Sequence, residues 1–297
     1  MEYLTVQGVE IPSLGLGTWR MEGPECRRAV SDALDLGYRH IDTAQAYGNE
    51  AQVGDAIAER DVDRDDLFVA TKLDGDHRAY DDVVDGVEES LDRLGLDSVD
   101  LLYIHWPNDV AVPGVDSVLP DWLELPDRIK PDAASVSTAE TLDAMQALRE
   151  EGKIDHIGVS NFGVDRLRAA RKYADAPILA DQVQYHPYWD QSELLDYCQS
   201  EDVLLAAYSP LAQGGVLHDD RLARIGRKYG KSPAQVALRW LLQQEHVATI
   251  PKATSHAHLE ANMAVFDFEL TDAEMLAVRQ PSKLKTAVGI LRGQSPF

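Results

Sequence analysis

Four side chains capable of acid–base chemistry follow apolar segments that we interpret as consecutive strands. Asp42 and Tyr47 follow one segment within "GYRHIDTAQAYGNE", and Lys72 and His105 stand at the ends of the next two. A buried carboxylate can hold an ammonium in place, and an ammonium beside a phenol favours the phenolate. Because a free phenol has a pKa near ~10, such lowering would make it a better proton donor at neutral pH. The histidine can hydrogen-bond a carbonyl oxygen or extend a proton relay.

The elements that must position these residues alternate regularly between strand and helix. After a hairpin that turns at Gln7-Gly8 and a first strand, the predicted strands are 39–41, 67–72, 99–104, 154–159, 178–183, 203–206 and 248–250. The predicted helices are 24–36, 50–59, 80–94, 138–150, 164–173, 193–200, 220–229 and 233–243. About eight such repeats favour an α/β protein with a (β/α)8 TIM barrel over a doubly wound sheet. We expect one domain over 1–297, with the working residues at the carboxyl ends of the strands.

One segment interrupts this alternation. Residues 108–136 contain four prolines and no sustained period, which predicts a long loop near the mouth of the barrel. Such a loop could be a binding loop or lid, with Trp122 covering a pocket, or a plain surface excursion.

Composition narrows the class of protein. No stretch approaches the ~18 apolar residues of a membrane span, and "MEYLTVQGVE" does not resemble a signal peptide, so we expect a cytoplasmic protein. The two cysteines, Cys26 and Cys198, have no metal-ligand spacing, and we expect reduced thiols and no metal.

The charge of the chain is strongly negative. The formal net charge is −23, with 33 Asp among 51 acidic residues and only 9 Lys among 28 basic ones. Such a surface repels nucleic acids and anionic membranes, so we expect neither as a partner. It fits adaptation to a high-salt cytoplasm, as in halophilic microbes, although an acidic mesophilic protein is the alternative.

Two short motifs do not support other enzyme classes. "GLGTWR" lacks the βαβ unit of a dinucleotide fingerprint, and "GVSNF" has Phe162 where a serine hydrolase needs a glycine.

Several blocks together resemble one family. "GYRHIDTAQAYGNE", "ATKL", "YIHWP", "IGVSNF", "QVQYHPY", "AAYSPL" and "TIPKA" are similar to the successive signatures of the aldo-keto reductases, in order and across nearly the whole chain. "SPAQVALRWLLQQ" and "VFDFELTDAEM" resemble the microbial diketogluconate reductase-like members. The resemblance implies a barrel whose amino-terminal hairpin closes the bottom, a catalytic tetrad of Asp42, Tyr47, Lys72 and His105, hydride transfer from a reduced nicotinamide, and proton donation by Tyr47.

The resemblance also implies ligand contacts. Cofactor contacts are expected at Gly17, Thr18, Asp42, Ser160, Asn161, Gln182, Tyr208, Ser209, Leu211, Lys252, Ser255, His258 and Asn262. Substrate contacts are expected at Trp19, Tyr47, Asp74, His105, Trp106 and Trp122. Purely structural roles remain open for three of these, because Ser160 and Asn161 could cap the following helix and Tyr208 could lie in the core.

Two departures from the family pattern bear on ligands. Asp74 replaces a tryptophan found in many relatives, which favours a polar or hydroxylated substrate. Ala253 and His258 replace the serine and arginine typical of relatives that prefer NADP, and histidine does not reproduce a bidentate phosphate clamp. We expect NADPH, with NADH or dual use as the alternative.

The expected function is reduction of small aldehydes, ketones or keto-sugars by a monomer. Two alternatives are a catalytically idle, cofactor-sensing subunit on the same fold, and an acidic interaction protein. The complete tetrad disfavours the first, and the dispersal of the acidic residues along helices disfavours the second.

Overall fold

The computed structural model describes residues 1–75, 77–107 and 136–279, so Trp122 and nearly all of the 108–136 loop lie outside it. Its strands are β1 Tyr3–Val6, β2 Val9–Pro12, β3 Leu16–Gly17, β4 His40–Asp42, β5 Phe68–Leu73, β6 Val99–Ile104, β7 Ile154–Ser160, β8 Ile178–Gln184, β9 Leu204–Tyr208 and β10 Val247–Thr249. Its α-helices are α1 Gly23–Asp35, α2 Glu50–Ala58, α3 Tyr80–Leu94, α5 Thr138–Glu150, α6 Val164–Tyr173, α7 Ser192–Ser200, α8 Asp220–Tyr229, α9 Pro233–Leu242, α10 His256–Met263 and α11 Asp272–Val278. Three 3-10 turns are η1 Gln45–Tyr47, η2 Arg64–Asp66 and η5 Ala212–His218.

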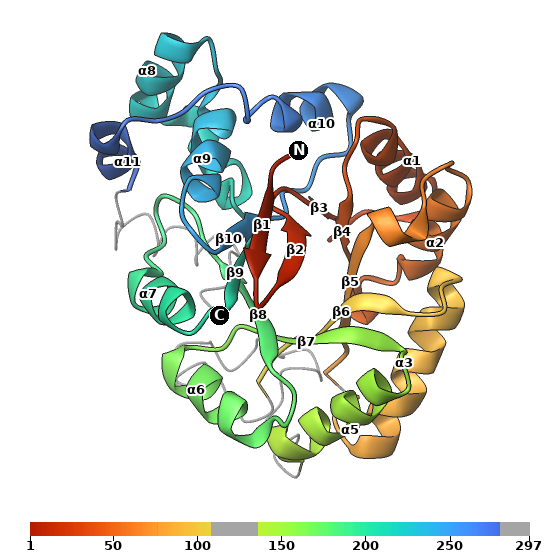
Figure 1. The fold of residues 1–297 in the computed structure, drawn as a ribbon. Helices are drawn as coiled ribbons and strands as arrows, with labels where there is room; N and C mark the ends of the chain where they lie inside the picture. Colours follow the sequence, from red (N-terminus) through yellow and green to blue (C-terminus); the bar gives the residue numbers. More distant parts are fainter. Residues whose placement is uncertain (76, 108–135, 280–297) are drawn as a thin grey trace, which may run out of the picture.

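Strands β3 to β10 form one parallel sheet in chain order, with helices around its outside (Figure 1). A parallel bridge between Leu14 and Thr249 joins the first strand to the last. Gly17 lets the same two segments approach closely further along, because a Cβ at that position would lie 2.6 Å from the carbonyl oxygen of Ile250. The predicted (β/α)8 barrel is therefore confirmed.

The antiparallel hairpin of β1 and β2 lies across one end of the barrel, as Figure 1 shows. Val6 and Ile11 from the hairpin pack with Phe68 and Leu101, which face the barrel interior. The inner apolar cluster is therefore closed at this end, and the ends of the parallel strands, where a barrel of this kind places its working residues, lie at the other end.

Most elements match the sequence prediction to within one or two residues, whereas helices α10 and α11 were not predicted. Capping accounts for several helix starts: Ser137 accepts a hydrogen bond from the backbone N–H of Glu140, and Ser232 forms a capping box with Gln235. These caps fix where the chain turns from loop into helix.

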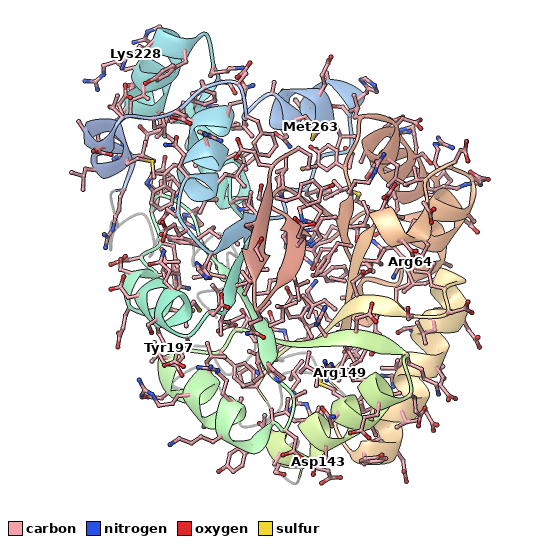
Figure 2. All side chains as sticks on the ribbon, viewed as in Figure 1. Arg64, Asp143, Arg149, Tyr197, Lys228 and Met263 are labelled. Atoms are coloured by element: carbon pink, nitrogen blue, oxygen red, sulfur yellow. The ribbon has the colours of Figure 1, made fainter. Side chains whose placement is uncertain are left out.

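Charged side chains extend from the outer helices (Figure 2), as with Asp143 on α5 and Lys228 on α8. Across the described ranges, no helix is both long and apolar enough to cross a membrane.

Candidate active site

Asp42 and Lys72 form a buried ion pair at the carboxyl ends of β4 and β5. The Nζ atom of Lys72 lies 2.5 Å from Oδ1 of Asp42 and donates to the carbonyl oxygen of Thr43 at 2.9 Å. The other carboxylate oxygen of Asp42 accepts a hydrogen bond from Nε2 of Gln182 at 2.6 Å. Both charges are almost fully buried, so the geometry of the pair is fixed by direct contacts rather than by water.

Tyr47 lies on the turn η1, one short loop beyond Asp42. The ammonium of Lys72 is 5.0 Å from the centre of the Tyr47 ring, and the His105 ring packs edge-on against it at 5.8 Å between centroids. Among the described residues, the Tyr47 hydroxyl has no hydrogen-bond partner. The structure thus brings all four residues of the predicted tetrad to one end of the barrel.

Burial raises the pKa of Tyr47 well above its ordinary value, and the negative charge of Asp42 acts in the same direction. Burial lowers the pKa of Lys72, whereas Asp42 and Glu50 oppose that change. The net direction is therefore opposite to our prediction of a lowered pKa, because burial and the charge of Asp42 outweigh the effect of the nearby Lys72 ammonium. The phenol is protonated at neutral pH, as a proton donor must be.

A second polar cluster lies at the ends of β7, β8 and β9. The amide of Asn161 donates to the carbonyl oxygen of His105 and to Oγ of Ser160, both at 3.0 Å, and its Oδ1 accepts from the Tyr208 hydroxyl at 2.8 Å. Ser160 Oγ donates to the carbonyl oxygen of Gln182 at 2.8 Å. These contacts bind the second cluster to both the Asp42–Lys72 pair and the His105 segment.

The expected substrate contacts other than Trp122, which is outside the described residues, also lie at or after strand ends. Trp106 stacks beside His105 with 6.3 Å between ring centroids, and Asp74 follows β5 directly. Trp19 is exposed after β3, with the guanidinium of Arg20 4.3 Å from its ring centre.

The remaining expected cofactor residues lie beyond β3, β9 and β10. The hydroxyl and the backbone N–H of Thr18, next to Gly17, both donate to the carbonyl oxygen of Asp42 at 3.0 Å. Ser209 and Leu211 follow Tyr208 and are half-buried.

The residues expected near the phosphates of the cofactor lie around helix α10. Lys252, Ser255 and His258 are exposed, and Lys252 donates to the carbonyl oxygen of Arg20 at 2.8 Å. Ser255 caps α10 by accepting from the backbone N–H of His258. Asn262 differs from these, because it is buried with its side chain against the Tyr38 hydroxyl.

Sequence reasoning missed the buried residues that support this end of the barrel. Nδ2 of Asn49 donates to the carbonyl oxygens of Thr18 and Met21, and its Oδ1 accepts from Thr43 at 2.7 Å. Both Asn49 and the neighbouring Glu50 stand in the "GNE" of the opening motif, which was the one available signal. Within the described part of the chain, no group of three or more His, Cys, Asp or Glu side chains could hold a metal ion.

Comparison with known proteins decides the family. Residues 13–282 match the model of the Aldo/keto reductase family. The chain belongs to the aldo/keto reductase family. Among curated relatives, it is 39% identical over 269 residues to a glyoxal reductase of Bacillus subtilis (strain 168), covering 90% of this chain and 88% of the relative.

Solved structures agree with this assignment. A candidate 2,5-diketo-D-gluconic acid reductase B is 42% identical with a TM-score of 0.84, covering 94% of this chain and 90% of that one. A Bombyx mori aldo-keto reductase in complex with NADP is 34% identical with a TM-score of 0.82, covering 94% and 92%. This aldo/keto reductase is thus an oxidoreductase that reduces carbonyl groups with a nicotinamide cofactor, and no finding favours an idle subunit.

Proposed function

We propose that this aldo/keto reductase reduces small aldehydes, ketones or keto-sugars with NADPH, and that Tyr47 protonates the carbonyl oxygen. The observation that carries the proposal is the surroundings of Tyr47: its ring lies beside Lys72 and His105, and its hydroxyl has no hydrogen-bond partner among the described residues. A hydroxyl that keeps its proton at neutral pH and donates it to no described protein group can donate it to the carbonyl oxygen of a bound substrate.

The roles of the other three residues follow from their contacts. Lys72 places a positive charge near the phenol, which stabilises the phenolate formed as the proton leaves. Asp42 holds Lys72 at 2.5 Å, and its negative charge opposes the lowering of the Lys72 pKa by burial. His105, edge-on to Tyr47, is placed to hydrogen-bond the same substrate oxygen.

The polar cluster at β7 to β9 fits the head of a nicotinamide. Ser160, Asn161 and Gln182 combine amide N–H donors with oxygen acceptors, which suits a carboxamide. Tyr208 is held by its hydroxyl on Asn161 and is only partly buried, so its ring can stack on a planar group. When bound, the reduced nicotinamide supplies a hydride to the carbonyl carbon.

The choice of NADPH rests on the exposed residues near α10. Lys252 and Ser255 offer a charge and a hydroxyl to a phosphate, and His258 stands where relatives that prefer NADP have arginine. One neighbouring structure contains NADP, which supports the same choice. NADH or dual use is the alternative, and the ratio of kcat/KM for the two cofactors decides between them.

The substrate class is inferred from Asp74, a charged residue among the expected substrate contacts. Asp74 follows β5 at the same end of the barrel as Trp106 and Trp19, and a carboxylate there suits a small substrate that carries hydroxyl groups. The printed names of the relatives, glyoxal reductase and diketogluconic acid reductase, are in line with small polar carbonyl compounds.

The experiment is a panel of carbonyl substrates, with oxidation of the reduced cofactor followed by its absorbance. We expect turnover with small hydroxylated aldehydes and dicarbonyls, and a lower kcat/KM with bulky apolar aldehydes. Absence of turnover across the panel, with the cofactor bound, would support the idle-subunit alternative. We further propose that the enzyme works in the cytoplasm as a single-domain monomer.

A further inference from the structure

The turn that carries Tyr47 is held in place by the side chain of Gln45, two residues earlier. Nε2 of Gln45 donates to the carbonyl oxygen of Gly86 at 2.8 Å and to Oγ of Ser90 at 3.0 Å, both on helix α3. Its Oε1 accepts from the backbone N–H of Asp74 at 2.6 Å. One side-chain amide thus joins η1 to α3 and to the loop after β5.

A fourth contact completes the amide and fixes its orientation. Nδ1 of His77 lies 2.9 Å from Oε1 of Gln45. The carbonyl of Gly86 can only accept and the N–H of Asp74 can only donate, so the nitrogen of Gln45 must face the former and the oxygen the latter. Nδ1 of His77 therefore carries a proton and donates it to Gln45. All four polar positions of the amide are used.

Helix α3 contains a glycine at the point where this cluster lies against it. A glycine inside a helix costs about 1 kcal/mol relative to alanine. A Cβ at Gly86 would lie 2.6 Å from Nδ1 of His77. The glycine therefore allows His77, and with it the loop that carries Asp74, to approach the helix closely.

The same network reaches the strand of Lys72. The hydroxyl of Ser90 donates to Oε2 of the buried Glu50 at 3.4 Å. Oε1 of Glu50 accepts from the hydroxyl of Thr71 at 2.6 Å, and Arg93 donates to Oε2 at 2.7 Å. Because Thr71 directly precedes Lys72, a continuous path of hydrogen bonds links the turn of Tyr47 to the strand of Lys72 through one helix.

We propose that Gln45 is a positioning residue, which sets the place of the Tyr47 phenol relative to Lys72 and to the loop of Asp74. Gln45 itself takes no part in the chemistry, since all four of its polar positions bind protein groups. The inference rests on the proposed role of Tyr47 as proton donor. A displacement of about 1 Å at a reacting group can lower the rate about 100-fold, so loss of this anchor should be visible in turnover.

The main variant is Gln45→Met, which keeps the length of the side chain and removes its hydrogen bonds. We expect kcat to fall by about 10- to 100-fold, while the Kd of the cofactor changes less than about twofold, since the residues proposed to bind it are elsewhere. The solvent deuterium isotope effect on kcat should increase, because proton transfer becomes slower. Unchanged kcat, or a fall in kcat matched by an equal loss of folded protein, would overturn the proposal.

Gln199→Met is the matched control, because Gln199 also donates to a backbone carbonyl, that of Glu245, but on a different helix, α7. It should leave kcat and the isotope effect unchanged. Should Gln45→Met fail to fold, Ser90→Ala removes one bond of the network and keeps the helix. We then expect a smaller fall in kcat with unchanged circular dichroism, and unchanged kcat in a folded Ser90→Ala protein would overturn the proposal.

The Tyr47→Phe variant distinguishes failure of the proposed function from failure of the positioning role of Gln45. If Tyr47→Phe retains full turnover, the proposed function fails. If Tyr47→Phe is nearly inactive while Gln45→Met turns over normally, only the positioning role fails. We expect Gln45→Met to add no further loss in the Tyr47→Phe protein, because no donor remains to be displaced, and an additive loss would contradict positioning through Tyr47.

Discussion

The ammonium of Lys72 lies 2.5 Å from the carboxylate of Asp42, and the pair is nearly inaccessible to solvent. Burial of the Tyr47 phenol beside this pair raises its pKa well above the ordinary value, and the charge of Asp42 acts in the same direction, so the phenol keeps its proton at rest. The ammonium of Lys72, 5.0 Å from the centre of the ring, opposes both effects, because its positive charge stabilises the phenolate. The phenol is therefore protonated before the reaction, and Lys72 lowers the free energy of losing that proton.

Lys72→Met should lower kcat strongly and leave cofactor binding largely intact. The substitution leaves the Asp42 carboxylate buried without its ammonium, and this charge disfavours the phenolate of Tyr47. An unpaired buried charge also costs about 3–5 kcal/mol in the free energy of unfolding. Steady-state kinetics, cofactor titration and chemical denaturation measure the three quantities.

The double variant Asp42→Asn with Lys72→Met is the control for that loss. It removes both charges, so we expect most of the stability to return while kcat stays low. Recovery of turnover together with stability would show that Lys72 acts only in folding, and would contradict its role beside the phenol.

Asp181→Asn should stabilise the protein at neutral pH. Asp181 is fully buried, one of its carboxylate oxygens has no hydrogen-bond partner, and burial raises its pKa well above the ordinary value. The unfolded chain loses this proton near pH ~4 whereas the folded protein keeps it, so wild-type stability falls as the pH rises above that value.

The pH dependence of the effect identifies its source. Because the folded protein keeps the proton that the unfolded chain loses, we expect the gain in the free energy of unfolding to be present at pH ~7 and to shrink towards zero near pH ~4. Urea denaturation of both proteins across this range gives the difference. A gain that does not depend on pH would mean that ionisation of Asp181 is not its source.

His258→Arg should increase the preference for NADPH over NADH. His258 is exposed in the first turn of α10, and an arginine there could bind a phosphate with two hydrogen bonds. We expect the ratio of kcat/KM for NADPH to that for NADH to rise about tenfold. The change should be in KM rather than in kcat. The ratio measured with Glu260→Gln, which raises the charge of the same helix by one as His258→Arg does, controls for the change in charge; an equal rise there would exclude a specific contact.

Salt should stabilise this protein if its net charge of −23 reflects a high-salt cytoplasm. Screening shortens the range of repulsion from about 10 Å at 0.1 M salt to about 3 Å at 1 M. We therefore expect the free energy of unfolding to rise between low salt and molar KCl. Stability that stays constant or falls over this range would favour an ordinary acidic protein.

The barrel and its tetrad could be predicted because their signals are local. Each strand is a short apolar run, and Asp42, Lys72 and His105 stand at strand ends, so the fold alone brings them together. Helix α10 was missed because only Leu259 and Asn262 are buried on it, which leaves no apolar stripe.

The supporting contacts could not be predicted, because they depend on packing between distant segments. Gln45 and Glu50 meet Ser90 on a helix some 40 residues later, and nothing in the spacing of these residues indicates it. The pKa of Tyr47 was predicted in the wrong direction for the same reason, since the sequence identifies Lys72 as a neighbour but gives neither the depth of burial nor the 2.5 Å contact with Asp42.

Tyr47→Phe tests the central claim most directly, because it removes the hydroxyl and keeps the ring that packs against Lys72 and His105. We expect kcat for carbonyl reduction to fall by at least about 100-fold, while the folded structure and the Kd of the cofactor are unchanged. The measurement is single-turnover oxidation of the bound reduced cofactor with a saturating aldehyde. Full turnover in the phenylalanine variant would contradict the assignment of Tyr47 as proton donor.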